Sequence, residues 1–107
     1  MFLGPFLTST VDIYVTRRSP GVYILSRDGK TVAYVGRSDE DLSSRIKQSI
    51  GEGSYSHFWF EYLSSPKEAF DKECEYYHKY NPPENKNHPG VLPGTNWKCP
   101  IIGCPFS

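Results

Sequence analysis

Glu73 is the residue whose type and position point most directly to chemistry. It shares a helical stripe with Ala69, Tyr77 and Tyr80. A helix that only packs would carry an apolar side chain there, because burying an unpaired carboxylate is costly. Glu73 therefore needs either a function or a charged partner. A salt bridge to Arg45 or to a lysine, without catalysis, is the alternative interpretation.

Two tyrosines, Tyr23 and Tyr34, lie in neighbouring strand-like runs over residues 22–25 and 31–35. The Asp-Gly pair at 28–29 favours a two-residue turn between these runs, which predicts an antiparallel hairpin. In that register Tyr23 is directly opposite Tyr34, and both phenols lie on one face of the sheet. A longer loop or a bulge would shift this register.

A helix is predicted after the second of these strands. Residues 38–41, Ser-Asp-Glu-Asp, are typical of a capping box with acidic residues in the first turn. Leu42, Ile46 and Ile50 then recur at helical spacing before two glycines end the segment. One face of this helix is expected to pack on the sheet.

An aromatic run over residues 57–63 has the length and composition of a third strand. A second capping box begins at Ser65, with proline at the first helical position, and the helix must end at the prolines of positions 82–83. Residues 8–16 are rich in β-branched and aromatic types and predict an extra edge strand. The expected fold is α/β of the α+β kind: a three-stranded, mostly antiparallel sheet flanked by helices.

The length, charge and hydrophobic runs of the chain limit the possible folds and functions further. A length of 107 residues suits a single domain, 1–107, and the prolines and glycines of residues 86–107 predict an irregular tail. Lys plus Arg and Asp plus Glu both number 12, which argues against tight nucleic-acid binding by this chain alone. The apolar start is brief and no run reaches the length of a membrane span, so a cytoplasmic protein is expected.

The tripeptides Gly-Val-Tyr at 21–23 and Tyr-Val-Gly at 34–36 resemble the two that name the GIY-YIG nuclease superfamily. Further matching residues follow at similar intervals: Arg45 on the first expected helix, Glu73 within the second, and Asn85 after the prolines. Neither tripeptide is specific alone. The spacing of the whole set carries the resemblance.

The resemblance covers a nuclease core over residues 20–85, and segment 68–85 is especially similar to the nuclease domains of bacterial excision-repair incision proteins. Val22 stands where the family name has Ile. Residues 1–19 and the tail after Asn85 have no counterpart in the family.

The family likeness implies a metal-dependent endonuclease, a hydrolase that cuts phosphodiester bonds in nucleic acid, with DNA as the expected substrate. It implies that Tyr23 acts as a base or orients water and that Tyr34 supports it. Glu73 would ligate a single Mg²⁺ or Mn²⁺ ion. Arg45 would clamp the scissile phosphate, and Asn85 would brace the site by hydrogen bonds.

Three more residues are expected to bind substrate. Arg37 and Lys47 offer positive charge to phosphates, and His57, at the start of the aromatic strand, would reach the edge of the site. Small nucleases of this kind often borrow specificity from an attached domain. A partner protein or a homodimer is therefore expected to supply specificity here.

Each candidate has a simpler interpretation when taken singly. Sheets favour tyrosines for packing, and Arg45 beside Leu42 and Ile46 is compatible with a side chain that snorkels from an apolar stripe. At the level of function, the alternative is a non-catalytic nucleic-acid or protein interaction module with the same fold. The presence of all five family site residues favours the enzyme.

The three cysteines, Cys74, Cys99 and Cys104, are too few and odd in number for a secreted disulfide scaffold. Cys99 and Cys104 are separated by four residues, which is not the two-residue spacing of a zinc knuckle, and no second ligand pair is evident. Reduced packing thiols are the leading interpretation. A local disulfide and a partial metal site with His88 are the alternatives, and His78 has no assigned role.

Overall fold

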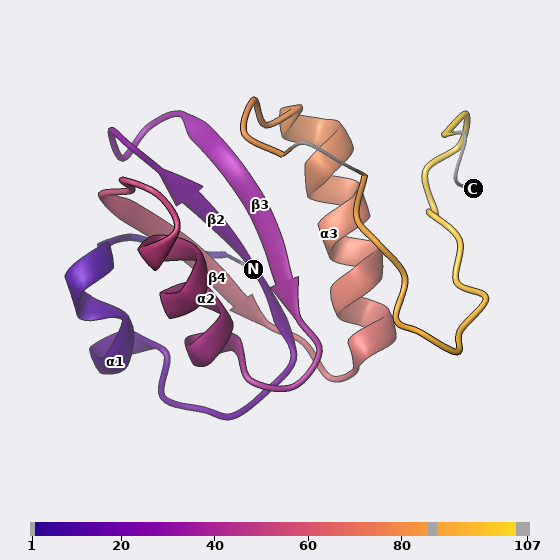
Figure 1. Cartoon of the computed structure of the whole chain (residues 1–107), viewed down its shortest axis with the longest axis horizontal. Helices are drawn as coiled ribbons and strands as arrows, with labels where there is room; N and C mark the ends of the chain where they lie inside the picture. The colour runs from indigo at the N-terminus through magenta and orange to yellow at the C-terminus, as the bar shows by residue number, and fades with distance from the viewer. Residues whose placement is uncertain (1, 86–87, 105–107) are drawn as a thin grey trace.

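A four-stranded antiparallel sheet in the order β1-β4-β2-β3 forms the centre of the molecule, as the computed structural model of the chain shows (Figure 1). The structure describes residues 2–85 and 88–104. The elements follow the order β1 (Leu3–Leu7), η1 (Thr8–Thr10), α1 (Val11–Tyr14), β2 (Gly21–Ser26), β3 (Val32–Ser38), α2 (Leu42–Gly51), β4 (His57–Tyr62) and α3 (Pro66–Tyr80). The expected α+β architecture is confirmed, with one strand more than predicted.

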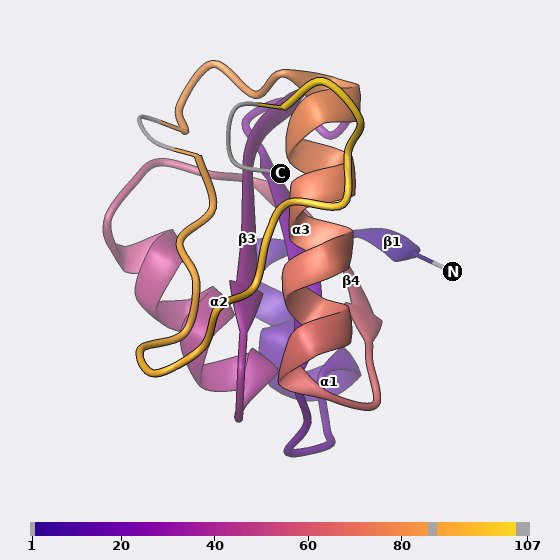
Figure 2. The same ribbon diagram turned by 90° about the vertical axis from the view of Figure 1, so that its right-hand side faces the viewer.

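Helices cover both faces of this sheet (Figure 2). The short α1 and α2 pack on one face around Tyr23 and Leu25, and α3 lies on the other face near Val22 and Ile24. All six residues of β2 are buried, because this strand is central and both of its faces are covered. β3 is the edge strand next to it, and its outer edge is hydrogen-bonded to residues 84–85, just after α3.

The hairpin register differs from the predicted one. Tyr23 is opposite Gly36, and Leu25 is opposite Tyr34, with a bulge after Leu25. The loop is longer than two residues because the Asp28 carboxylate accepts hydrogen bonds from the backbone N–H groups of residues 30 and 31, at 2.8 and 2.7 Å. These bonds hold the pKa of Asp28 well below its usual range. The register moves by two residues, so both phenols still share one face.

The predicted edge strand over residues 8–16 is wrong. β1 occupies the sheet edge beside β4 instead, and the chain then turns into η1 and α1. Val11 and Val15 are both buried in the core. Their separation of four residues suits a helical turn against α2, and this packing overrides the β propensity of the segment.

The two longer helices begin at side-chain caps. Asp41 caps α2 and Ser65 caps α3, by accepting hydrogen bonds from the N–H groups of Ser44 and Glu68. The α2 cap lies at the end of the predicted box. α3 ends at Asn81, which adopts the left-handed conformation with φ 46° just before the two prolines.

The C-terminal segment, residues 88–104, contains no helix or strand among its described residues. Positions 86–87 and 105–107 of the predicted irregular tail lie outside the described residues. The segment packs beside α3, where Trp97, Cys99 and Cys104 join Phe70 and Cys74 in a small second core. In the ranges 2–85 and 88–104, no helix is long and apolar enough to cross a membrane.

The left-handed cap at Asn81 gives a stability prediction. Asn81→Gly should leave the free energy of unfolding unchanged or raise it by up to about 1 kcal/mol, because glycine has no Cβ penalty there. Asn81→Val should lower it by about 1 to 2 kcal/mol. Urea denaturation measures both, and equal stability of the two variants would contradict the cap.

Candidate active site

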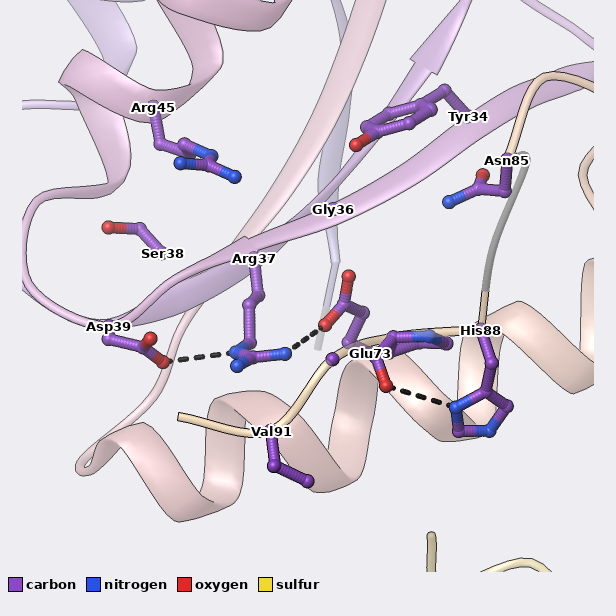
Figure 3. A pocket seen from close by; sticks show the side chains of 12 residues that line it. Tyr34, Gly36, Arg37, Ser38, Asp39, Arg45, Glu73, Asn85, His88 and Val91 are labelled. Carbon is purple, nitrogen blue, oxygen red and sulfur yellow. Dashed lines mark hydrogen bonds and ion pairs between the residues drawn. The ribbon is translucent and has the colours of Figure 1, made fainter. Parts of the chain in front are cut away.

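A polar cavity of about 350 Å³ opens where β3, α2, α3 and the C-terminal segment meet (Figure 3). We call it the β3 cavity. Five of the eight predicted site residues line it: Tyr34, Arg37, Arg45, Glu73 and Asn85. The fold therefore brings together residues that are as much as 51 positions apart, from Tyr34 to Asn85.

Glu73 is 8% exposed, so its carboxylate is nearly removed from bulk water. Its Oε1 atom accepts a hydrogen bond from Nη1 of Arg37 at 2.6 Å, and Arg37 also donates from Nε to Asp39 at 3.0 Å. The partner is thus Arg37, and neither Arg45 nor a lysine. Burial still outweighs the attraction of Arg37 and raises the pKa of Glu73 to about 7.

The second carboxylate oxygen of Glu73 suits a cation. Among the described residues Oε2 has no hydrogen-bond partner, and no buried side-chain oxygen or nitrogen there is unsatisfied. Oε2 therefore reaches the open space of the β3 cavity. Hard divalent cations such as Mg²⁺ take one or two carboxylate oxygens and fill their other positions with water or phosphate oxygens. The donor set fits such an ion.

Tyr34 and Arg45 approach the cavity from different elements. Figure 3 shows the Tyr34 hydroxyl and the Arg45 guanidinium directed toward the same space beside Gly36. Burial and the charge of Glu73 raise the pKa of Tyr34, and the charge of Arg45 acts in the opposite direction. At neutral pH the phenol is protonated, and the guanidinium supplies positive charge to the cavity.

Tyr23 is fully buried and lies behind the cavity, outside its lining. Its hydroxyl shares a hydrogen bond of 2.5 Å with Oγ of Ser49 on α2. Its ring centroid is 6.3 Å from that of Tyr34. Burial raises the pKa of Tyr23 far above that of a free phenol, while the Ser49 hydrogen bond acts against this rise. Tyr23 is therefore a neutral phenol at neutral pH.

Gly36 is required by the position of Tyr23. A Cβ at position 36 would lie 2.5 Å from the Tyr23 hydroxyl oxygen and closer still to its Cζ. Only glycine lets the ring pass beneath β3 to reach Ser49. Gly36, the glycine of the second tripeptide, thus leaves the space that Tyr23, the tyrosine of the first, occupies.

Asn85 binds the outer edge of β3 in the way that another strand would. Its Oδ1 accepts from the Val35 N–H, and its Nδ2 donates to the Val35 carbonyl, both at 2.9 Å. The Glu84 N–H also donates to the Ala33 carbonyl at 3.0 Å. These bonds hold the chain after α3 against the sheet, so that it borders the cavity.

Lys47 and His57 do not line the cavity. Lys47 is two residues beyond Arg45, so it points to the other side of α2 and pairs with Asp12 at 2.8 Å. His57 lies at the far end of β4, where its Nδ1 contacts Oγ of Ser56 at 2.7 Å. The sequence indicated Lys47 as a cation close to Arg45 and His57 as the first residue of the aromatic strand.

The structure adds lining residues that the sequence did not indicate. Ser38 and Asp39 follow Arg37 at the end of β3, and residues 88–91 form the opposite wall. For Asp39, the one feature of the sequence that could have indicated a place in the lining is its position two residues after Arg37. Residues 88–91 offered none, because an irregular segment has no periodicity from which its contacts can be read.

The fold and the cavity can be set beside known structures. No protein-family model matches the chain, and no curated protein shows significant similarity to it. The GIY-YIG N-terminal endonuclease domain of UvrC from Thermotoga maritima, bound to its catalytic divalent cation magnesium, is 25% identical, with a TM-score of 0.56. The match covers 72% of this chain and 92% of that domain.

A point mutant of the same Thermotoga maritima domain, bound to its catalytic divalent cation, is 23% identical with a TM-score of 0.58. That match covers 74% of this chain and 93% of the other. The chain has a GIY-YIG-like fold. The resemblance that the two tripeptides indicated is therefore confirmed at the level of the fold.

The contact between Gly36 and Tyr23 can be tested by stability. Gly36→Ala should lower the free energy of unfolding by about 1 to 3 kcal/mol, because the new methyl group displaces a fully buried ring. The control is Gly51→Ala in α2, where a Cβ meets nothing within 4 Å. That variant should be neutral or more stable by up to about 1 kcal/mol. Equal losses in both variants would contradict the proposed contact.

The raised pKa of Glu73 predicts how stability depends on pH. Between pH 4.5 and about 7 the unfolded chain releases this proton while the folded chain retains it, so stability falls as pH rises through this range. Relative to Glu73→Gln, the wild type should lose about 1 to 3 kcal/mol across the range in metal-free buffer.

The matched control for this pH effect is Asp71→Asn, which removes a half-exposed carboxylate that pairs with Lys67 on the same helix. Urea denaturation at several pH values measures all three proteins. If Glu73→Gln is the less stable protein above pH 7, the carboxylate is a net stabilising ion-pair member and the desolvation argument fails.

Proposed function

We propose that the chain is a metal-dependent nuclease that hydrolyses phosphodiester bonds in nucleic acid, with DNA as the first substrate to test. The observation that carries this proposal is the buried Glu73 carboxylate, whose Oε2 opens into a cavity that Arg45 and Tyr34 also line. We assign the nuclease core to residues 20–85. The metal-bound endonuclease domains that share the fold support the assignment.

The proposed metal ligand is Glu73, with a single Mg²⁺ or Mn²⁺ as the ion. When bound, a divalent cation neutralises charge that develops on the phosphate during hydrolysis. The same cation would hold Glu73 ionised near neutral pH, although burial raises the pKa of this carboxyl to about 7. Arg37 keeps the carboxylate in place through Oε1 and leaves Oε2 for the ion.

Arg45 is the proposed phosphate clamp. Its planar guanidinium can bind two phosphate oxygens at once, which orients the phosphate as well as neutralising it. Arg45 has no resolved partner among the ion pairs of the described residues, whereas Arg37 is held by Glu73 and Asp39. No carboxylate of the described residues therefore holds the Arg45 guanidinium, which interacts with the Tyr23 hydroxyl and also lines the β3 cavity, where a phosphate can reach it.

We exchange the roles that the family likeness first implied for the two tyrosines. Tyr34 lines the cavity, so we propose its phenol as the group that contacts the attacking water and orients it. Tyr23 is a positioning residue, because its ring supports β3 at Gly36 and its hydroxyl is bound to Ser49. Asn85 is a second positioning residue, through its bonds to Val35.

A non-catalytic interaction module with the same fold is the alternative. The Arg37–Glu73 ion pair favours it, because a structural ion pair needs no metal. The two functions differ in cleavage, which only the nuclease performs. Substrate contacts by Lys47 and His57, specificity from a partner protein or homodimer, and a cytoplasmic location stay predictions.

The proposal predicts cleavage that depends on metal and on Glu73. The purified protein should nick supercoiled DNA with Mg²⁺ or Mn²⁺ and stop when the metal is chelated. Glu73→Gln and Arg45→Ala should each lower the rate by at least about 100-fold, while Asp71→Asn should cut like the wild type. Tyr34→Phe should reduce the rate more than Tyr23→Phe does, once the fraction of folded protein is matched.

The substrate panel for this assay contains supercoiled, linear, branched and single-stranded DNA together with RNA. If every substrate survives both metals with folded wild-type protein, the interaction module is the better conclusion. If Glu73→Gln still cuts, then Glu73 is not part of the active site.

A further inference from the structure

Four potential metal ligands from two parts of the chain converge beside the C-terminal half of α3. They are His78, His88, Cys99 and Cys104, and their nearest ligand atoms all lie within 4.8 Å of one another. Sγ of Cys99 is 3.4 Å from Nε2 of His78, and Sγ of Cys104 is 3.3 Å from Nε2 of His88. The sequence indicated a partial metal site of the cysteine pair with His88 as one alternative, but it assigned no role to His78, which completes the set.

These separations suit one ion at the centre of the four atoms. With Zn–S and Zn–N bonds of about 2.3 and 2.0 Å, the ligand atoms of a tetrahedral site lie about 3.3 to 3.8 Å apart. The two sulfur–nitrogen distances fall in or at the edge of this range, and no pair among the four exceeds it by more than about 1 Å.

The hydrogen bonds of His88 place its ring for metal binding. Nδ1 lies 3.0 Å from the carbonyl oxygen of Pro89, which can only accept, so Nδ1 carries the proton (Figure 3). In the neutral ring Nε2 then has a lone pair, and this atom is the one that faces Cys104. Histidine ligands of metals commonly donate their other ring N–H to a backbone carbonyl in this way.

Simpler explanations account for only part of the cluster. A disulfide between Cys99 and Cys104 would leave no reason for two imidazole nitrogens to approach the sulfurs, and all the cysteines are unbridged thiols in the structure. Apolar packing explains the burial of the thiols beside Phe70, but it does not explain the approach of histidines. The mixture of two soft sulfurs and two imidazoles is a ligand set that zinc prefers.

We propose that His78, His88, Cys99 and Cys104 bind one zinc ion in a tetrahedral structural site that fastens the C-terminal segment to α3. Both thiols bind as thiolates, so binding releases two protons to solvent. All four positions are filled by protein, which leaves none for a substrate and makes the site structural. The inference does not depend on the proposed nuclease function, because none of the four residues is a proposed ligand of the magnesium ion.

The site also explains how an irregular segment keeps its place. Residues 88–104 have no helix or strand in the described structure, so a metal crosslink supplies order that regular hydrogen bonding does not. His88 lines the β3 cavity together with Pro89, Gly90 and Val91. Zinc at this position therefore holds one wall of the cavity.

The test is the zinc content of the tag-free, purified chain, measured by inductively coupled plasma mass spectrometry after dialysis. We expect about one zinc ion per chain, and less than about a tenth of that in His78→Ala, Cys99→Ser and Cys104→Ser. Cys74→Ser is the matched control, because Cys74 is a buried thiol of the same small core but lies outside the four-residue cluster. Both Cys74→Ser and Glu73→Gln should retain zinc, the latter because magnesium and zinc bind at different places.

Cobalt titration of the metal-free wild type keeps the proposal testable if the ligand variants do not fold. Tetrahedral cobalt should give visible absorption bands together with thiolate charge transfer in the near ultraviolet, and zinc but not magnesium should displace it. Folded wild-type protein that takes up neither metal would overturn the proposal. So would a loss of zinc in Cys74→Ser as large as in Cys99→Ser.

Limited trypsin digestion tests the fastening of the segment. Lys98 lies next to the ligand Cys99, so cleavage after Lys98 should speed up at least about 10-fold when zinc is removed and slow again when zinc is returned. Equal cleavage rates with and without zinc would show that the ion does not hold the segment.

Discussion

The desolvated carboxylate of Glu73 is the constraint around which this molecule is arranged. α3 packs on β3 and β2, and that packing carries Glu73 into a layer where a bare charge is unfavourable. Arg37 compensates from β3, and its own position depends on Asp39 and on the ring of Phe70, whose centroid is 5.2 Å from Cζ of Arg37. The compensation is incomplete, since the pKa of Glu73 stays near 7. A cation bound at this site would supply the compensating positive charge that Arg37 does not provide.

The sheet contributes to the same site because β3 forms one side of the β3 cavity. Tyr23 reaches beneath β3 only because position 36 is glycine, and its hydrogen bond to Ser49 thereby joins β2 to α2. Tyr34, by contrast, lines the β3 cavity. The two tyrosines of the paired tripeptides thus have different environments, one dry and one open to the cavity, although they lie on one face of the same hairpin. Because both residues are tyrosines, the difference in their burial is what separates their proposed roles.

The remaining wall comes from chain that has no regular structure. The side-chain amide of Asn85 joins it to β3 by two hydrogen bonds with the backbone of Val35, and the proposed zinc site joins it to α3. Fastening at both ends would limit the motion of residues 88–91 across the cavity opening. This arrangement would make the stability of the wall sensitive to zinc and the chemistry of the cavity sensitive to magnesium, through different residues.

Local signals in the sequence determined the two longer helices and the central strands. Ser65 and Pro66 start α3, the prolines after Asn81 end it, and the spacing of Leu42 and Ile46 defines α2, because caps and periodicity act over a few residues. The hairpin register escaped prediction because the side chain of Asp28 lengthened its loop. Only the tertiary structure decided that Arg37 is the partner of Glu73, that Tyr23 is buried and Tyr34 is not, and that two histidines meet two cysteines. These contacts join elements far apart in the chain, and no short-range pattern encodes which side chains packing will bring face to face.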